Sequence, residues 1–236
     1  LKDDLGHHET IIKAEGLQKT FKIGQNEIGA LNNVDLKVNA TDFIVIFGPS
    51  GCGKSTLLNI ISGVDSPTKG EVEVRGTKIF SLDDDERGAF RARKMGIVHQ
   101  MPFWIKSLNV IENIALPIII QGEPEKKAKA RAANVMEELK ITSFAKQIPT
   151  QLSGGQQQKA SLARALVTNP WIILADEPTG NLDSSSADEM MGLFDNLNRS
   201  YKRTIMLVTH NQAYWDMGTR RIEMLDGKIV KEVGHG

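Results

Sequence analysis

The sequence predicts an α/β domain in which a parallel sheet forms the core, beside a smaller antiparallel sheet and an inserted helical subdomain. Three observations support this prediction. Short apolar runs rich in β-branched residues alternate with segments of helical periodicity, a pattern typical of parallel strands buried on both faces. Pairs of short strand-like runs flank glycine-containing turns, as in β-hairpins. Between about residues 100 and 165 the strand pattern disappears.

The apolar runs place the core strands. They are expected at residues 43–47, 97–98, 172–175 and 204–209. Two hairpins are expected to form the smaller side sheet: one pairs residues 71–74 with 78–80, and the other pairs 222–225 with 228–230 across Asp226 and Gly227.

The strand-free region predicts the division of the chain. In residues 125–140, charged side chains such as Lys126, Lys129 and Arg131 are interleaved with alanines in a helical pattern. We therefore expect a single domain over residues 1–236, with a core formed by 1–99 and 166–236 and a helical subdomain over 100–165.

Composition limits the partners. Lys plus Arg equals Asp plus Glu at 29 each, so the formal net charge is zero. The chain therefore has no net positive charge to attract nucleic acid or to hold it on anionic lipid. No apolar stretch approaches the roughly 18 residues that span a bilayer, so any membrane association is expected to come through a protein partner. A single cysteine, together with an opening segment Leu1 to Asp4 unlike a signal peptide, points to the cytoplasm.

A glycine-rich loop between a predicted strand and a predicted helix has the form of a P-loop. The loop and the start of the helix comprise Gly48, Pro49, Ser50, Gly51, Cys52, Gly53, Lys54, Ser55 and Thr56. Glycines let successive N–H groups point inward, and the helix start adds its positive dipole, which favours bound phosphate. Lys54 supplies positive charge at the phosphates, and Ser55 offers a hydroxyl to Mg²⁺. Cys52 is most simply a small residue tolerated in the loop.

Two acids and a histidine follow two other strands. Asp176 is expected beside the magnesium shell. Glu177 is expected next to the attacking water, for which it would act as the general base. His210 ends the strand 204–209 and is placed to bond the γ-phosphate or the attacking water, although a lone histidine at a strand end is usually structural.

A second glycine-containing helix start comes later in the chain. Leu152 to Gln156 reads Leu-Ser-Gly-Gly-Gln, so Ser153 and the amides of Gly154 and Gly155 form a second candidate anion site. Two phosphate cradles are more than one nucleotide site on one chain requires.

With these motifs in this order, the sequence resembles the ATP-binding-cassette (ABC) ATPases, whose signature motif is Leu-Ser-Gly-Gly-Gln. The resemblance implies a RecA-like P-loop NTPase core with ATP and Mg²⁺ as ligands. It assigns Gln100 to the Q-loop, which contacts magnesium, and Asp183 to the D-loop. It also implies that Phe21 stacks on adenine, although a bare phenylalanine would more often be core.

The resemblance also implies partners. The signature of one subunit closes over the ATP on the P-loop of another, so a homodimer is the simplest assembly and a different cassette is the alternative. The segments 67–71, 81–86, 108–113 and 176–184 resemble those of the MacB, LolD and FtsE group. This resemblance implies an integral membrane permease with a large extracytoplasmic domain and a cassette peripheral to the inner face of the cell membrane. Phe103 and Trp104 either anchor that permease or fill the subdomain core. The competing function is a soluble ABC ATPase acting on nucleic acid or ribosomes.

Overall fold

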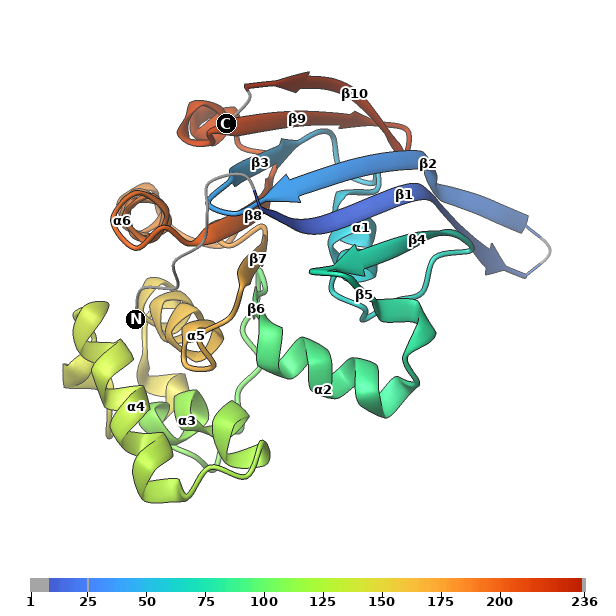
Figure 1. The fold of residues 1–236 in the computed structure, drawn as a ribbon. Coiled ribbons are helices and arrows are strands. Elements are labelled where there is room, and N and C mark those ends of the chain that lie inside the picture. Colours follow the sequence, from blue (N-terminus) through green and yellow to red (C-terminus); the bar gives the residue numbers. More distant parts are fainter. Residues whose placement is uncertain (1–8, 25, 235–236) are drawn as a thin grey trace.

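Two β-sheets and a group of helices make up residues 9–24 and 26–234, the part of the chain that the computed structural model describes (Figure 1). The opening residues 1–4, on which the expectation about a signal peptide rests, lie outside this part. No helix within the described residues is long and apolar enough to cross a membrane.

The core is a six-stranded sheet. Across the sheet its strands are β10 (Lys228–Val233), β9 (Arg220–Leu225), β3 (Phe43–Phe47), β8 (Thr204–Thr209), β7 (Ile172–Asp176) and β6 (Met95–Val98). All neighbours from β9 to β6 are parallel, and β10 pairs antiparallel with β9. The four core strands expected from the apolar runs are all present.

The second sheet is antiparallel and has four strands. They lie in the order β2 (Asn26–Asn39), β1 (Thr10–Ile23), β4 (Lys69–Val74) and β5 (Thr77–Lys78). The sequence analysis did not anticipate β1 and β2, which are 14 residues long each. Several register shifts interrupt their pairing, so the alternation of apolar and polar residues that marks a strand is irregular here.

The assignment of the C-terminal hairpin to the side sheet was wrong. The hairpin itself forms, with Asp226 and Gly227 both at positive φ in its turn. However, β9 pairs in parallel with β3, with Ile46 opposite Ile222. Ile222 and Met224 are fully buried, which shows that the apolar face of the hairpin packs into the core. The hairpin therefore joins the core sheet.

The first hairpin is shorter than expected. Its turn is Arg75 and Gly76, both at positive φ, and β5 ends at Lys78. Ile79, expected in the strand, instead begins a 3₁₀ turn (Ile79–Ser81) and is buried. Burying this isoleucine in the core ends the pairing early.

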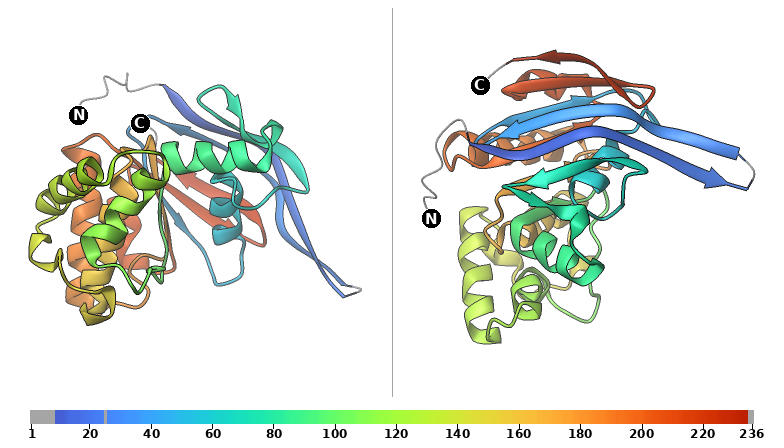
Figure 2. Two further views of the ribbon diagram at one scale, coloured as in Figure 1. Left: turned by 90° about the horizontal axis from the view of Figure 1, so that it is seen from below. Right: turned by 45° about the vertical axis from the view of Figure 1, so that its right-hand side comes forward.

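Six α-helices occur in the described part of the chain. They are α1 (Lys54–Ile61), α2 (Asp84–Lys94), α3 (Val110–Ile120), α4 (Glu125–Glu138), α5 (Gly154–Leu166) and α6 (Ser184–Arg199). Figures 1 and 2 show α3 to α6 grouped away from the antiparallel sheet. The helix expected over 125–140 is α4, and it ends at Glu138. The helical subdomain is present as α3, α4 and the signature end of α5. The boundaries proposed above, 1–99 and 166–236 against 100–165, stay a proposal.

The core sheet separates two hydrophobic clusters. In β3, Phe43 and Val45 face the cluster that includes α3, α5 and α6, whereas Ile44 and Ile46 face α1 and the antiparallel sheet. This alternation is the period of two that a strand buried on both faces requires. Both faces of the strand that precedes the P-loop are therefore held by packed neighbours.

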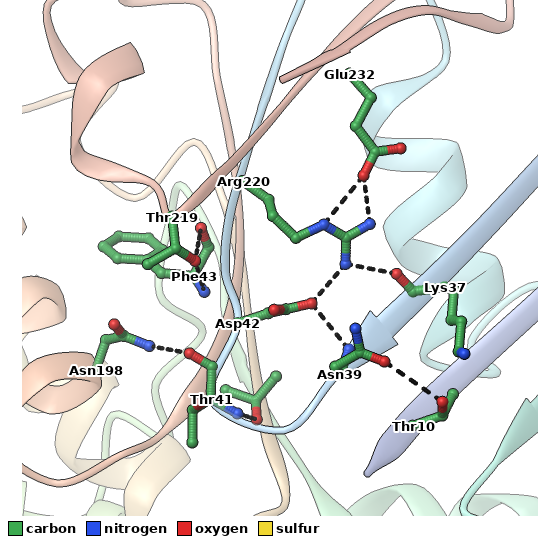
Figure 3. A network of polar contacts seen from close by, with 11 residues as sticks. Thr10, Lys37, Asn39, Thr41, Asp42, Phe43, Asn198, Thr219, Arg220 and Glu232 are labelled. Atoms are coloured by element: carbon green, nitrogen blue, oxygen red, sulfur yellow. Dashed lines mark hydrogen bonds and ion pairs between the residues drawn. The ribbon is translucent and has the colours of Figure 1, made fainter. Parts of the chain in front are cut away.

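A polar network joins the two sheets where β2 leads into β3 (Figure 3). The buried guanidinium of Arg220 lies 2.5 Å from Asp42, donates to the Lys37 carbonyl at 2.7 Å, and pairs with Glu232. Asp42 also accepts from the backbone N–H of Asn39 at 2.8 Å. Removing one partner of such a pair leaves a buried charge, which typically costs about 3–5 kcal/mol.

Candidate active site

The loop after β3 is shaped by its glycines. A Cβ atom at Gly53 would lie 2.3 Å from the Ala30 carbonyl oxygen, and one at Gly48 would lie 2.3 Å from the Met224 carbonyl oxygen. Gly53, at φ 102°, is the N-cap of α1 and makes no side-chain capping bond. The first backbone N–H groups of α1 are therefore not taken up by a side-chain cap, which suits them to an anion.

Lys54 folds back over this loop. Its ammonium donates to the carbonyls of Gly48 at 2.7 Å and Pro49 at 2.8 Å, and lies 3.9 Å from Cys52 Sγ. The side chain is buried, so the charge is held inside the loop. A phosphate entering the loop would meet a positive charge already in place.

Ser55 and Asp176 bring two oxygen donors together. The Ser55 hydroxyl donates to Asp176 Oδ1 at 2.9 Å, joining the start of α1 to the end of β7. Burial raises the pKa of the Asp176 carboxyl, and the neighbouring Glu177 also raises it, whereas the Ser55 hydrogen bond and the charge of Lys54 lower it. A cation at this carboxylate would favour its ionised form.

Glu177 turns out of the sheet immediately after β7. Its φ of 48° lies in the left-handed region, which is sparsely populated by residues other than glycine, and its N–H donates to the Val208 carbonyl at 3.0 Å. Its carboxylate lies 2.8 Å from Nδ1 of His210. Because β7 and β8 are parallel neighbours, their carboxyl ends present both side chains at one edge of the sheet.

These residues line one cleft of about 370 Å³. It is lined by Ser50, Gly51, Gly53, Lys54, Ser55, Thr56, Gln100, Glu177 and His210. Every one of them was proposed from the sequence. Gly48, Pro49 and Cys52 contact the Lys54 ammonium, and Asp176 is hydrogen-bonded to Ser55, which lines the cleft.

The remaining predicted ligand residues lie outside the lining of this cleft. Ser153 is the N-cap of α5, where its Oγ accepts from Gln156 N and its N–H donates to the Gln156 side chain. Gly154 and Gly155 form the first turn of the same helix. Phe21 lies in β1 and is 39% exposed. The chain does not bring these residues to its own phosphate cradle.

Asp183 has a local structural task in this chain. It is the N-cap of α6, accepting from the Ser186 N–H at 3.0 Å and from the Ser186 hydroxyl at 2.7 Å. These bonds lower the pKa of its carboxyl. Its predicted role toward a nucleotide stays a prediction.

The structure separates the two aromatics after the Q-loop. Trp104 packs against the helical core, donates from Nε1 to Gln157 at 3.1 Å, and carries the Arg164 guanidinium over its ring. Phe103 is 73% exposed, next to Met101 at 68%. The core interpretation therefore fits Trp104, and only Phe103 is placed to meet a partner.

Two residues that support Gln100 were missed. A Cβ at Gly180 would lie 2.8 Å from Gln100 Nε2, so glycine lets the Q-loop side chain approach. Gln158, which is 2% exposed, donates to the His99 carbonyl at 2.8 Å and so ties α5 to the Q-loop. Gly180 carried a signal, a glycine in the turn after the two acids. Gln158 carried none, because its partner is 59 residues away.

Comparisons with known proteins agree with this geometry. The family model described as ABC transporter matches residues 31–180. The chain is 39% identical over 219 residues to the lipoprotein-releasing system ATP-binding protein LolD of Alcanivorax borkumensis, covering 93% of this chain and 96% of that protein. It is 36% identical over 226 residues to the macrolide export ATP-binding/permease protein MacB of Syntrophobacter fumaroxidans, covering 95% of this chain and 32% of that protein.

A solved structure is similar over nearly the whole chain. It is described as the dimeric, post-hydrolysis state of the ATP-binding cassette MJ0796, bound to ADP and Pi, and MJ0796 comes from Methanocaldococcus jannaschii. The TM-score is 0.88 at 40% identity, and the match covers 96% of this chain and 100% of that one.

Proposed function

Because this chain belongs to the ABC transporter family, we propose that it binds ATP with Mg²⁺ and hydrolyses it to ADP and phosphate to drive a membrane transporter. The observation that carries the proposal is the convergence of three groups of residues in one region. They are Lys54 in its glycine-rich loop, Ser55 with Asp176, and Glu177 with His210. A phosphate cradle, a cation site and a base for water are the parts that phosphoryl transfer to water needs.

The donor set of this site fits Mg²⁺. The Ser55 hydroxyl and the Asp176 carboxylate are oxygen ligands within 2.9 Å of each other, and Gln100 lines the same cleft. Magnesium prefers oxygen ligands and is usually held by one or two carboxylates together with substrate phosphates. When bound, Mg²⁺ would neutralise charge on the β- and γ-phosphates.

The side chains then divide the work. Lys54 and the amides at the start of α1 bind the phosphates and stabilise the charge on the transferring group. Glu177 accepts a proton from the attacking water. The water oxygen then bonds the γ-phosphorus, and the bond from that phosphorus to the ADP oxygen breaks. His210, fixed 2.8 Å from Glu177, orients that carboxylate and can bond the γ-phosphate.

A second cassette would complete the site. Ser153, Gly154 and Gly155 lie outside this chain's own cleft and are offered at a helix start. The dimeric description of the MJ0796 structure supports a pair of cassettes. We propose that the two lie head to tail, with each signature closing over the other's ATP. Either a second copy or a different cassette fits this role.

The membrane partner is proposed to be a permease of the kind that works with ATPases of the MacB, LolD and FtsE group. This permease would have a large extracytoplasmic domain, and the cassette is proposed to sit at its cytoplasmic side. The similarity to MacB, described as an ATP-binding/permease protein, supports this proposal. Phe103, exposed beside the Q-loop, is the aromatic that would anchor such a partner.

Changing Glu177 to Gln tests the hydrolytic role. The amide is nearly the same size but a far weaker base, so we expect hydrolysis to fall by about 10²–10⁴-fold while ATP binding persists and an ATP-bound dimer accumulates. Phosphate release and size-exclusion chromatography with ATP and Mg²⁺ measure the two effects. Glu138→Gln, at an exposed position at the end of α4, is the matched control and should behave as the wild type. Unchanged hydrolysis in the Glu177 variant would refute the assignment.

A further inference from the structure

The ammonium of Lys19 lies over the ring of Phe21. It is 4.9 Å from the ring centroid, a distance at which a cation is attracted to the aromatic face. The same ammonium donates to Asp65 Oδ1 at 2.6 Å and to the Ser66 carbonyl at 2.7 Å. The Lys19 side chain is only 13% exposed, so its position is set by the ring and these two oxygens.

The loop that holds Lys19 is the one that follows α1. Two backbone contacts extend the junction: Thr68 N–H donates to the Gln18 carbonyl at 2.7 Å, and Thr20 N–H donates to Thr68 Oγ1 at 3.0 Å. Helix α1 starts at the P-loop and ends at Ile61. One short helix therefore connects the phosphate cradle to the junction beneath Phe21, which fixes the spacing between the two.

Phe21 lies where the sheet gives little other support. The pairing of β1 with β4 ends at Gln18, opposite Lys69, and beyond it β1 pairs only with β2. Figures 1 and 2 show this part of the hairpin extending past β4. A two-stranded hairpin is marginally stable by itself, so the ring needs an anchor at this point. Lys19 is the side chain that provides it.

We infer that Lys19 is a positioning residue for the nucleotide base, holding Phe21 as a platform between the cation on one face and adenine on the other. The inference rests on the proposed function, ATP binding, together with the expectation from the family resemblance that Phe21 stacks on adenine. A ring fixed before binding loses less side-chain entropy when the base arrives. The residue is still 39% exposed, which leaves surface for a second stacking partner.

The inference predicts a loss of affinity that depends on the base. Losing one base–aromatic stack corresponds to a loss of affinity of about 5- to 150-fold. Lys19→Met should therefore weaken ATP binding by about fivefold or more. It should leave the binding of inorganic tripolyphosphate unchanged, because that ligand has no base. Both are measured in the chain of residues 1–236 by displacement of a fluorescent ATP analogue in the presence of Mg²⁺.

The controls separate positioning from general damage. Lys22→Met removes the same charge from the same strand, but Lys22 is 79% exposed and pairs with Glu27, so it should bind ATP as the wild type does. Lys19→Arg keeps a cation for the ring and for Asp65 and should recover most of the affinity. Lys19→Met combined with Phe21→Ala should bind no more weakly than Phe21→Ala alone, because the lysine acts through the ring.

The outcomes distinguish the inference from the proposal beneath it. If Phe21→Ala weakens ATP binding but Lys19→Met does not, the inference is wrong and base stacking stands. If Lys19→Met weakens tripolyphosphate as much as ATP, the lysine supports the cradle and the inference also fails. If Phe21→Ala binds ATP with wild-type affinity, Phe21 does not stack on the base and the inference is wrong. If the wild-type chain binds no ATP, the proposed function itself is refuted.

Discussion

Helices α1 and α5 both begin at a glycine-containing motif, yet their first turns are finished differently. At α1 the N-cap is Gly53, which has no side chain to accept from the helix amides. At α5 the N-cap is Ser153, and a capping box with Gln156 satisfies two backbone N–H groups at that end. One start is left open for a ligand, and the other is stable by itself in the single chain.

Their surroundings differ in the same sense. The start of α1 adjoins Glu177 and His210 in one cleft. The start of α5 packs against α6, where a Cβ at Gly155 would lie 2.9 Å from the Ser186 side chain. A single chain thus holds the complete set of reactive side chains at α1, whereas α5 presents a helix start without them. Because the start of α5 lies outside the lining of this chain's own cleft, the difference supports the proposal that it acts at the cleft of a second cassette.

The largest effect is expected at the open start. Lys54→Ala removes the charge held over the loop, and losing charge-assisted hydrogen bonds to phosphate should lower ATP affinity by about 100-fold or more. Titration with a fluorescent ATP analogue measures it. An affinity within twofold of the wild type would mean that Lys54 only braces the Gly48 and Pro49 carbonyls.

A smaller and different effect is expected at the capped start. Ser153→Ala should leave the ATP affinity of the monomer unchanged but reduce ATP-dependent dimerisation about tenfold in the Glu177→Gln background, because one hydrogen bond to a charged phosphate is lost. Size-exclusion chromatography across protein concentrations measures the dimer.

Asn109→Ala is the matched control for Ser153→Ala. Asn109 caps α3 through an equivalent box with Glu112, far along the chain from the signature. Both variants should lose about 1 kcal/mol of stability, but only the Ser153 variant should lose the dimer. Equal loss of dimer in both would show that helix stability, not the signature, is responsible.

The smallest effect compares the third helical position of the two starts. Gln156→Ala breaks the capping box and should lower the free energy of unfolding by about 0.5–1 kcal/mol. Thr56→Ala, at the same position of α1, removes no side-chain cap and should stay within about 0.5 kcal/mol of the wild type. Chemical denaturation of the nucleotide-free chain measures both, and equal losses would contradict the distinction between open and capped starts.

Much of the site was predictable because its parts are local in sequence. Lys54 and Ser55 are fixed by the turn between one strand and one helix, and Glu177 and His210 each follow a buried strand. Parallel strands must bring such ends to one edge, so the cleft follows from the strand pattern. Gln158 and Gly180 escaped notice because their roles depend on neighbours that only packing supplies.

By itself the sequence determined the α/β core, the helical subdomain and the residues of the phosphate cradle, because strand periodicity and glycine geometry are short-range properties. Only the tertiary structure decided which sheet takes the C-terminal hairpin and which of Phe103 and Trp104 packs against the helical core. It also placed Lys19 against Phe21 through a loop 46 residues away. Each of these depends on which distant surfaces pack together, and no local pattern encodes that choice.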